Sequence, residues 1–402
     1  MEASKDELLI TIELLNHFHN EVKKGCKSLE DLVKRGNLWI EEIKEKYNSE
    51  AIYSGVKDVL LQAIFKFKAE SRISYNALIM KGGGIKGVAY VGALEELVKH
   101  YTFNWFAGTS AGAITAILLG AGYTVDELNT ILSKKNFNDF KDANQIKALF
   151  NFITKKGFFE ANTFNEWIEE LLATKLNSAV SVEMRDLAYR TTVYASRKDK
   201  SVQIFDSHKA DSQNTIAAFA ARCSMSIPVF FTPQKIDGIN IFDGGVKNNF
   251  PVDLILKDNE GTDFIGLYLG NVTYKQKKSS LLKDLFETWT ESNEPDILRL
   301  YKEKIIIIDP SPISTLQFSL NSIEKEFLLE SGRLAALNFL DKNKHLNKNL
   351  FNYEQRKFEL TKIKRKLILL KKTKESIYVD FFFLLLISGV IWYKFLVELI
   401  TC

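Results

Sequence analysis

The stretch Gly-Thr-Ser-Ala-Gly at residues 108–112 places one serine between two glycines with the spacing G-x-S-x-G. A serine nucleophile on a sharp turn between a strand and a helix needs small residues two positions before and two positions after it. The mainly apolar run 103–107 predicts a buried strand before the motif, and the apolar run 111–119 predicts a buried helix after it. Ser110 is therefore a candidate nucleophile at a strand–turn–helix junction.

A serine nucleophile needs a base, and two residues compete for this role. Histidine is the usual base, but most of the five histidines lie in polar helices or loops, where we expect them to be solvated; these are His17, His19, His100 and His345. His208, which follows an expected strand, is the remaining histidine candidate. Asp243 is the stronger candidate, because it follows the apolar residues Ile241 and Phe242 at the end of an expected strand and precedes two glycines, in a turn that exposes its carboxylate. The alternative is that Asp243 only shapes the turn, since Asp-Gly is a common turn dipeptide.

A glycine-rich segment lies about 25 residues before the serine. An apolar strand at 77–80 and an amphipathic helix at 88–98, with Glu95 and Glu96 on its exposed side, are expected to flank this loop. The loop consists of Lys81, Gly82, Gly83, Gly84, Ile85, Lys86 and Gly87. Backbone N–H groups at such a position converge on an anion, whether a phosphate or an oxyanion. The glycines also match the dinucleotide pattern G-x-G-x-x-G, but the second strand ends without the acidic residue that binds a ribose.

The three motifs GGGIKG, GTSAG and DGG, in this order, resemble those of the patatin-like phospholipases. Residues 222–228 and 248–251 are also similar to stretches of that family, so the resemblance covers roughly residues 76–342. Lys86 departs from the arginine that many members carry, and it keeps the positive charge. The resemblance implies hydrolysis of fatty-acyl esters of membrane phospholipids or lysophospholipids, with no metal or cofactor.

The resemblance also implies a role for each motif. Ser110 would be the nucleophile and Asp243 its base, in a dyad without histidine. The backbone N–H groups of residues 82–87 would form the oxyanion hole. The remaining motif residues would shape the nucleophile elbow (Gly108, Thr109, Ala111 and Gly112) and the turn after the base (Gly244 and Gly245).

Three alternatives to this activity stay open at the level of sequence. A triacylglycerol lipase or an acyltransferase would use the same dyad on another substrate or acceptor. A non-catalytic, lipid-binding member is disfavoured because every expected catalytic residue is present. A dinucleotide-binding protein is disfavoured by the missing ribose ligand.

Alternating strand and helix signals predict an α/β fold with three layers, α/β/α, around a mixed, mainly parallel central sheet. A hairpin over 191–196 and 201–205 makes the sheet mixed, and the runs 264–269 and 305–308 supply further buried strands. Thr124 and Glu127 have the spacing of a capping box at the start of another helix.

The chain is expected to contain additions on both sides of the α/β core. We predict an N-terminal helical segment over 1–73, a patatin-like domain over 74–342, a basic helical linker over 343–376 and a hydrophobic tail over 377–402. The N-terminal apolar stripe is expected to pack on the neighbouring domain, the alternative being a surface that binds a partner or lipid; it comprises Leu8, Leu9, Ile12, Leu14 and Leu15.

The C-terminal region suggests contact with lipid. Residues 356–374 contain nine Lys or Arg and one acid, Glu359, a composition that attracts anionic headgroups. A nucleic-acid partner is not expected, since the net charge is only +4 and no nucleic-acid fold accompanies the run. The segment 377–400 would measure about 36 Å as a helix and would span a bilayer, the alternatives being an interfacial helix or a helix packed on the enzyme.

Cellular context follows from charge and cysteine usage. The basic run before the tail predicts a membrane-associated enzyme domain that faces the cytosol. The acidic N-terminus shows no secretory signal, and three scattered cysteines fit a reducing compartment. An activating protein or ligand is left open.

Overall fold

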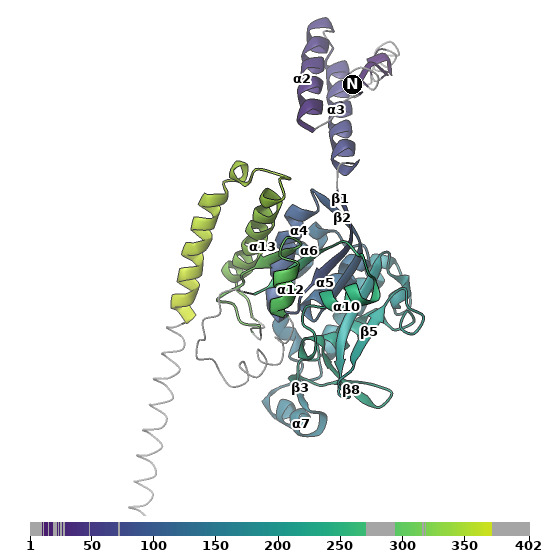
Figure 1. Cartoon of the computed structure of the whole chain (residues 1–402), viewed down its shortest axis with the longest axis vertical. Helices are drawn as coiled ribbons and strands as arrows, with labels where there is room; N and C mark the ends of the chain where they lie inside the picture. Colours follow the sequence, from purple (N-terminus) through teal and green to yellow (C-terminus); the bar gives the residue numbers. More distant parts are fainter. Residues whose placement is uncertain are drawn as a thin grey trace, which may run out of the picture. The chain divides into compact units, whose positions relative to one another are not determined.

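The computed structural model describes residues 29–47, 49–70, 73–270, 294–315, 317 and 319–371, together with scattered positions between residues 10 and 26. Its contacts divide the chain into two compact units, residues 1–74 with 98–102 and residues 75–97 with 103–402. Figure 1 shows the helices and strands of both units. The finer domain boundaries expected from the sequence remain a prediction.

The N-terminal unit is helical and has a hydrophobic cluster of its own. Helices α2 (Leu29–Lys46) and α3 (Glu50–Glu70) pack closely, because a Cβ on Gly36 of α2 would lie 2.2 Å from Leu60 of α3. Leu14, from the predicted apolar stripe, packs against this cluster. Ile12 is 48% exposed, and Leu8, Leu9 and Leu15 lie outside the described residues.

The second unit is built on a mixed sheet with the strand order β10-β9-β1-β2-β4-β8-β7, and β5 also pairs with β4. The pairs β10–β9, β9–β1 and β2–β4 are parallel, whereas β4–β5, β4–β8 and β8–β7 are antiparallel. The strands are β1 (Ile73–Met80), β2 (Tyr101–Thr109), β4 (Arg190–Arg197), β5 (Val202–Asp206), β7 (Gln234–Ile236), β8 (Ile239–Asp243), β9 (Phe264–Leu269) and β10 (Ile305–Ile308). This arrangement confirms the predicted mixed sheet, in which β10, β9 and β1 pair in parallel, and its hairpin of β4 and β5.

Alternate residues of the strands face opposite sides of this sheet. Ala77 and Ile79 of β1, with Trp105 and Ala107 of β2, belong to one buried cluster. Helices α10 (Val252–Asp258) and α12 (Glu294–Leu300) cover this face through Val252, Ile255 and Ile297.

The opposite face packs against α5 (Ala111–Gly120), α9 (Ala217–Ser224) and α13 (Ser322–Lys342), and α4 (Val88–Leu97) packs on α13. Helices on both faces confirm the three-layer α/β/α class. The expected amphipathic character of α4 is wrong, because Glu96 is buried along with the apolar residues of that helix. The reason is that α6 (Val125–Lys134) and α13 both pack on α4.

The remaining elements lie in connections. The short 3-10 helices are η2 (Gly84–Gly87), η3 (Phe137–Phe140), η4 (Met184–Asp186), η5 (Gly244–Val246) and η6 (Lys348–Phe351). The other elements are the α-helices α7 (Gln145–Lys155) and α8 (Asn162–Leu176) and the strands β3 (Gly157–Phe159) and β6 (Val229–Phe231). Strands β3 and β6 form a separate parallel pair. The capping box is confirmed, since the Glu127 N–H donates to Thr124 Oγ1 and the Thr124 N–H donates to Glu127 Oε2.

A further helix covers residues 353–371 at the end of the described chain. No helix within the described residues has the length and apolarity required to cross a membrane. The predicted hydrophobic tail over 377–402 lies outside the described residues, and so do the last residues of the basic run.

The contact between α4 and α13 depends on glycines. A Cβ on Gly92 would lie 1.9 Å from the Leu329 carbonyl oxygen, and a Cβ on Gly332 would lie 2.0 Å from the Ala89 carbonyl oxygen. We therefore expect Gly92→Ala to lower the free energy of unfolding by about 3 kcal/mol, because overpacking forces the helices apart.

Urea unfolding followed by circular dichroism measures this effect. Ile323→Ala changes an exposed residue of α13 and serves as the control, with an expected change within about 0.5 kcal/mol. Equal stabilities for Gly92→Ala and the wild type would contradict the close helix contact.

Candidate active site

Ser110 lies at the junction between β2 and α5, as the sequence predicts. Its backbone has φ 53° and ψ −118°, a conformation that a residue with a side chain rarely adopts. The side chain is 5% exposed. A strained turn of this kind holds a nucleophile at the end of a strand, above the first turn of a helix.

The two glycines of G-x-S-x-G are required by close backbone contacts. A Cβ on Gly108 would lie 2.4 Å from the carbonyl carbon of Gly112, and a Cβ on Gly112 would lie 2.2 Å from the Met80 carbonyl oxygen. Any larger residue at either position would push α5 away from β1 and β2. The motif spacing therefore has a steric basis in this fold.

Ser224, at the end of α9, holds the turn from the other side. The Ser110 N–H donates to Ser224 Oγ over 2.8 Å, and Ser224 Oγ donates to the Tyr194 carbonyl oxygen over 2.6 Å. Because Ser224 is fully buried, these two bonds tie the serine turn to β4. The Ser110 N–H is thereby already used and is not available to an oxyanion.

Asp243 ends β8, and the strand register brings it to the level of Ser110. In β4, Tyr194 lies opposite Thr109 of β2, and the next residue, Ala195, lies opposite Asp243 of β8. The structure thus brings the two residues of the expected dyad together from strands on either side of β4.

The Asp243 carboxylate is buried, with 1% of the residue exposed. Its Oδ1 accepts a hydrogen bond of 2.7 Å from the Gly245 N–H. Its Oδ2 has no hydrogen-bond partner of ordinary geometry within the described residues. Burial raises the pKa of Asp243 to about 7, against smaller lowering effects of the Ser110 hydroxyl and the Gly245 N–H. The carboxylate is therefore a stronger base than an aspartate in water.

The glycine loop after β1 lies beside the serine. A Cβ on Gly82 would lie 3.3 Å from Ser110 Cβ, and Gly84 has φ +57°. The Gly82 N–H donates to the Asn249 carbonyl oxygen, and the Lys86 N–H donates to the Gly83 carbonyl oxygen. These two N–H groups of the predicted oxyanion hole are therefore engaged within the protein, and the N–H groups of Gly83, Gly84 and Ile85 remain candidate donors to an oxyanion.

A buried ion pair lies directly behind this loop. Lys81 and Glu294, at the start of α12, pair through Nζ and Oε2, and their side chains are only 9% and 7% exposed. Tyr268 Oη donates to the same Glu294 oxygen over 2.6 Å, and Lys81 Nζ lies 4.0 Å from the centre of the Tyr268 ring. The Lys81 N–H also donates to the Leu267 carbonyl oxygen. The residue that begins the glycine loop is thus held by both its backbone and its side chain.

An apolar cavity of about 80 Å³ adjoins Ser110. Its wall comes from η2, α4, α5, α6, η3, α8 and the segment around β6. It is lined by Gly84, Ile85, Gly87, Val88, Ser110, Ala111, Ile114, Thr115, Leu132, Phe137, Phe140, Phe164, Trp167, Met225, Ile227 and Phe231. An environment of this kind accepts an alkyl chain and excludes water from the serine.

The alternative base, His208, lies away from this arrangement. It follows β5, its side chain is exposed, and its N–H donates to Asp206 Oδ1. It is not among the residues that line the cavity at Ser110.

Comparisons with known proteins identify the family of this region. Residues 78–256 match the model of the family described as patatin-like phospholipase. The chain contains a patatin-like phospholipase domain. It is 28% identical to the uncharacterized protein YqhO of Bacillus subtilis, over 65% of this chain and 97% of that protein. It is also 27% identical to the probable lipid hydrolase 463L of Invertebrate iridescent virus 6, over 46% of this chain and 64% of that protein.

The solved structure of VipD from Legionella pneumophila aligns with this chain with a TM-score of 0.45 and 15% sequence identity, over 68% of each of the two chains.

Several residues of the patatin-like domain that hold the site were not identified from the sequence. Ser224 and Asn249 lie in segments that resemble the family, but their types alone do not indicate a role. Lys81 directly precedes the glycines, and this position next to the motif indicates a role in holding the loop. Glu294 lies 213 residues further along the chain, so nothing in its local sequence indicates the ion pair.

The raised pKa of Asp243 predicts a pH dependence for ester hydrolysis by the patatin-like domain. If Asp243 is the base, it must be ionised to act, so kcat/KM for a soluble p-nitrophenyl ester should rise about tenfold per pH unit below pH 7 and level off above it. Initial rates between pH 5 and 9 measure the profile. A rate independent of pH between 5.5 and 7.5 would contradict Asp243 as a base with this pKa.

The Lys81–Glu294 pair predicts strong coupling between two substitutions. Lys81→Met or Glu294→Leu alone leaves one buried charge without its partner and should lower the free energy of unfolding by about 3–5 kcal/mol. The double variant removes both charges and should lose much less than the sum of the two losses. A double-mutant cycle in urea measures this coupling, and additive losses would argue against a direct pair.

Proposed function

We propose that this protein is a serine lipid acyl hydrolase of the phospholipase A or lysophospholipase type. Membership of a family of lipid hydrolases supports ester hydrolysis. The observation that carries the finer proposal is the combination of a buried Asp243, whose pKa burial raises to about 7, beside Ser110 with an apolar cavity that begins at the same serine.

In the proposed first step, Ser110 Oγ attacks the ester carbonyl carbon while its proton passes to Asp243. The transfer accompanies the attack, because a carboxylate with a pKa of about 7 cannot hold a pre-formed alkoxide. The N–H groups of Gly83 and Gly84 are proposed to stabilise the oxyanion. Collapse of this intermediate breaks the ester bond, and the proton on Asp243 goes to the departing alcohol.

In the second step, water replaces the alcohol. Asp243 takes a proton from water as the water oxygen attacks the acyl carbon, and that proton then passes from Asp243 to Ser110 Oγ as the acyl–serine bond breaks and the fatty acid leaves. An acyl acceptor other than water would give transfer instead of hydrolysis, so the acceptor distinguishes an acyltransferase from a hydrolase.

The apolar cavity indicates the acyl chain as the recognised part of the substrate. Its volume of about 80 Å³ is well below the ~300–1,000 Å³ typical of ligand pockets. A long chain therefore requires part of the wall to move. The aromatic residues Phe137, Phe140 and Trp167, which come from η3 and α8, are the proposed moving wall.

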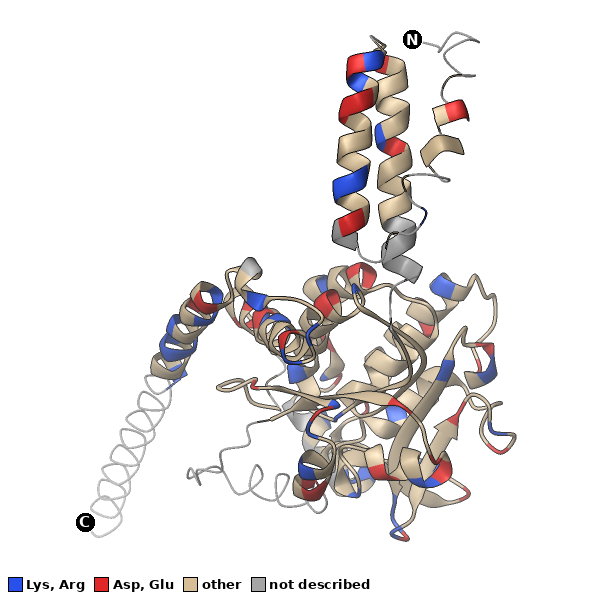
Figure 2. Cartoon of the chain, turned by 45° about the horizontal axis from the view of Figure 1, so that its top comes forward, with Lys and Arg blue, Asp and Glu red and all other residues tan. Residues whose placement is uncertain are grey.

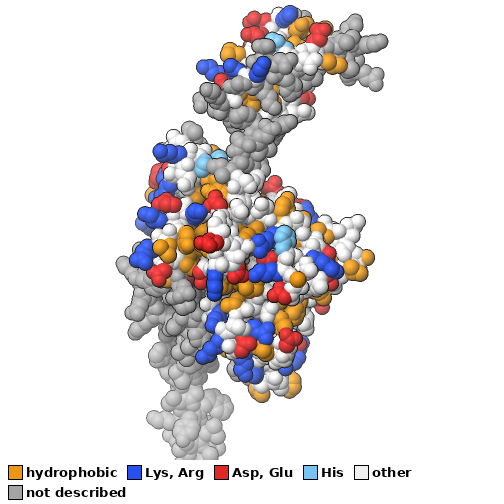
Figure 3. Space-filling view, turned by 45° about the vertical axis from the view of Figure 1, so that its right-hand side comes forward, with side chains coloured by type: hydrophobic (Ala, Val, Ile, Leu, Met, Phe, Trp, Pro, Cys, Tyr) orange, Lys and Arg blue, Asp and Glu red, His pale blue; other side chains and the backbone are white. Residues whose placement is uncertain are grey.

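The helix at 353–371 supports the proposed contact with anionic membranes. It exposes basic side chains and the apolar residues Phe358, Leu369 and Leu370, which are 59%, 63% and 50% exposed. Figure 2 shows Lys and Arg residues along the ribbon of this helix. In contrast, Figure 3 shows acidic and basic side chains intermingled on one face of the second unit, an arrangement that does not indicate a nucleic-acid surface.

The assay for this proposal is fatty-acid release from phosphatidylcholine vesicles, with and without phosphatidylglycerol, with calcium chelated. Ser110→Ala and Asp243→Asn should each lower the rate by at least about a thousandfold, because each removes one member of the dyad. The matched controls Ser133→Ala and Asp237→Asn change an exposed serine and an exposed aspartate and should retain the wild-type rate. Phosphatidylglycerol should raise the rate by strengthening attraction to the membrane.

Product analysis separates the candidate activities. A free fatty acid with a lysophospholipid identifies phospholipase action. Release only from triolein emulsions would identify a triacylglycerol lipase, and appearance of a new acyl ester with added lysophospholipid would identify transfer. Full activity of Ser110→Ala would overturn the proposed mechanism.

A further inference from the structure

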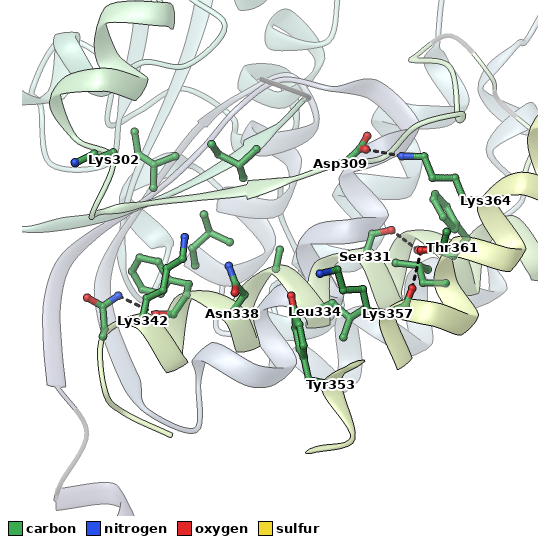
Figure 4. A pocket seen from close by; sticks show the side chains of 18 of the residues that line it. Lys302, Asp309, Ser331, Leu334, Asn338, Lys342, Tyr353, Lys357, Thr361 and Lys364 are labelled. Carbon is green, nitrogen blue, oxygen red and sulfur yellow. Dashed lines mark hydrogen bonds and ion pairs between the residues drawn. The ribbon is translucent and has the colours of Figure 1, made fainter. Parts of the chain in front are cut away.

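A second cavity, of about 500 Å³, lies in the same unit between β10, α13 and the helix at 353–371 (Figure 4). It shares no lining residue with the cavity at Ser110. Its volume falls within the range of small-molecule sites. The dyad chemistry described above makes no use of it.

The floor of this cavity is apolar. Ile307 lies in β10, the edge strand of the sheet, and is 40% exposed. Leu334 of α13 and Leu360 of the helix at 353–371 also line the cavity. Water against these side chains is unfavourable, and an alkyl chain in the cavity would remove their apolar surface from water.

The rim of the cavity is basic. Four lysines, Lys302, Lys342, Lys357 and Lys364, line it together with two acids, Glu303 and Asp309. Lys364 pairs with Asp309, and Lys302 lies 3.8 Å from Glu303 in an exposed pair. Within the described residues, Lys342 and Lys357 form no ion pair. Figure 4 places Lys342 toward one end of the cavity and Lys357 toward the other.

We propose that this second cavity binds one long-chain fatty-acid carboxylate. The apolar floor takes the alkyl chain, and an unpaired rim ammonium at either end takes the carboxylate. A neutral lipid would leave the excess positive charge of the rim without a counter-charge. The bound chain would contact β10, α13 and the helix at 353–371 at once and would stabilise their packing.

The test is direct binding of [1-¹³C]oleate, below its micelle concentration, to the full-length chain carrying Ser110→Ala. This background prevents turnover, so the result does not depend on whether the proposed hydrolysis is correct. We expect one oleate per chain, with a weaker affinity for uncharged oleyl alcohol. The double variant Lys342→Glu/Lys357→Glu should weaken oleate binding by about a hundredfold, since each reversal costs about tenfold.

Two control variants locate the binding. Lys366→Glu reverses one lysine charge on the exposed side of the helix at 353–371, outside the cavity, and should leave oleate affinity unchanged. Ile114→Trp fills the cavity at Ser110 and should also leave it unchanged. Ile307→Glu places a carboxylate on the floor from an exposed strand position and should weaken binding even if the double variant does not fold.

Three results would overturn the proposal. One is equal affinity for oleate in the folded double variant and its Ser110→Ala parent. Another is loss of binding only in Ile114→Trp, which would assign the fatty acid to the cavity beside the serine. The third is equal affinity for oleate and oleyl alcohol, which would show that the lysines do not recognise the carboxylate.

Discussion

The proposed chemistry depends on one physical constraint, the burial of the Asp243 carboxylate away from water. A carboxylate in water is a weak base, and removing it from water raises its proton affinity. The cost of burial is tolerable because the Gly245 N–H satisfies one oxygen and the serine hydroxyl approaches the carboxylate. Full neutralisation by a cation would have returned the pKa to a low value and weakened the base. The site therefore surrounds Asp243 with few donors and with close-packed backbone.

Close backbone packing also explains why glycines are concentrated around the serine. The end of β1, the turn after β2 and the turn after β8 approach one another so closely that a Cβ on Gly82, Gly112 or Gly244 would overlap a neighbour. Segments this close hold the groups of the site in fixed positions, which favours pre-organised stabilisation of charge. The Lys81–Glu294 pair adds a second support behind the glycine loop, where no substrate is expected to reach.

The two cavities differ in a way that suits different tasks. The cavity at Ser110 is small, aromatic and apolar, and it adjoins the groups proposed to react. The second cavity is larger and has a basic rim, with no member of the dyad near it. Helix α4 lines the cavity at Ser110, and α13 lines the second cavity. Because α4 and α13 pack against each other, a change in helix packing at one cavity can alter the other.

The sequence by itself determined the motifs, the strand–turn–helix junction at Ser110, the hairpin of β4 and β5, and the mixed α/β class. These features depend on local spacing, on the steric need for glycine and on apolar periodicity, which are readable in a short window. The same local reasoning failed for Glu96, because the burial of a helix face depends on which other helices pack on it.

Only the tertiary structure decided the remaining features of the site. The register through β4 places Asp243 beside Ser110, and burial then sets its pKa. Hydrogen bonds of the Gly82 and Lys86 N–H groups narrow the choice of oxyanion donors. The ion pair of Lys81 with Glu294 joins residues distant in the chain. Each of these depends on contacts between separate elements, and such contacts leave no local pattern in the sequence.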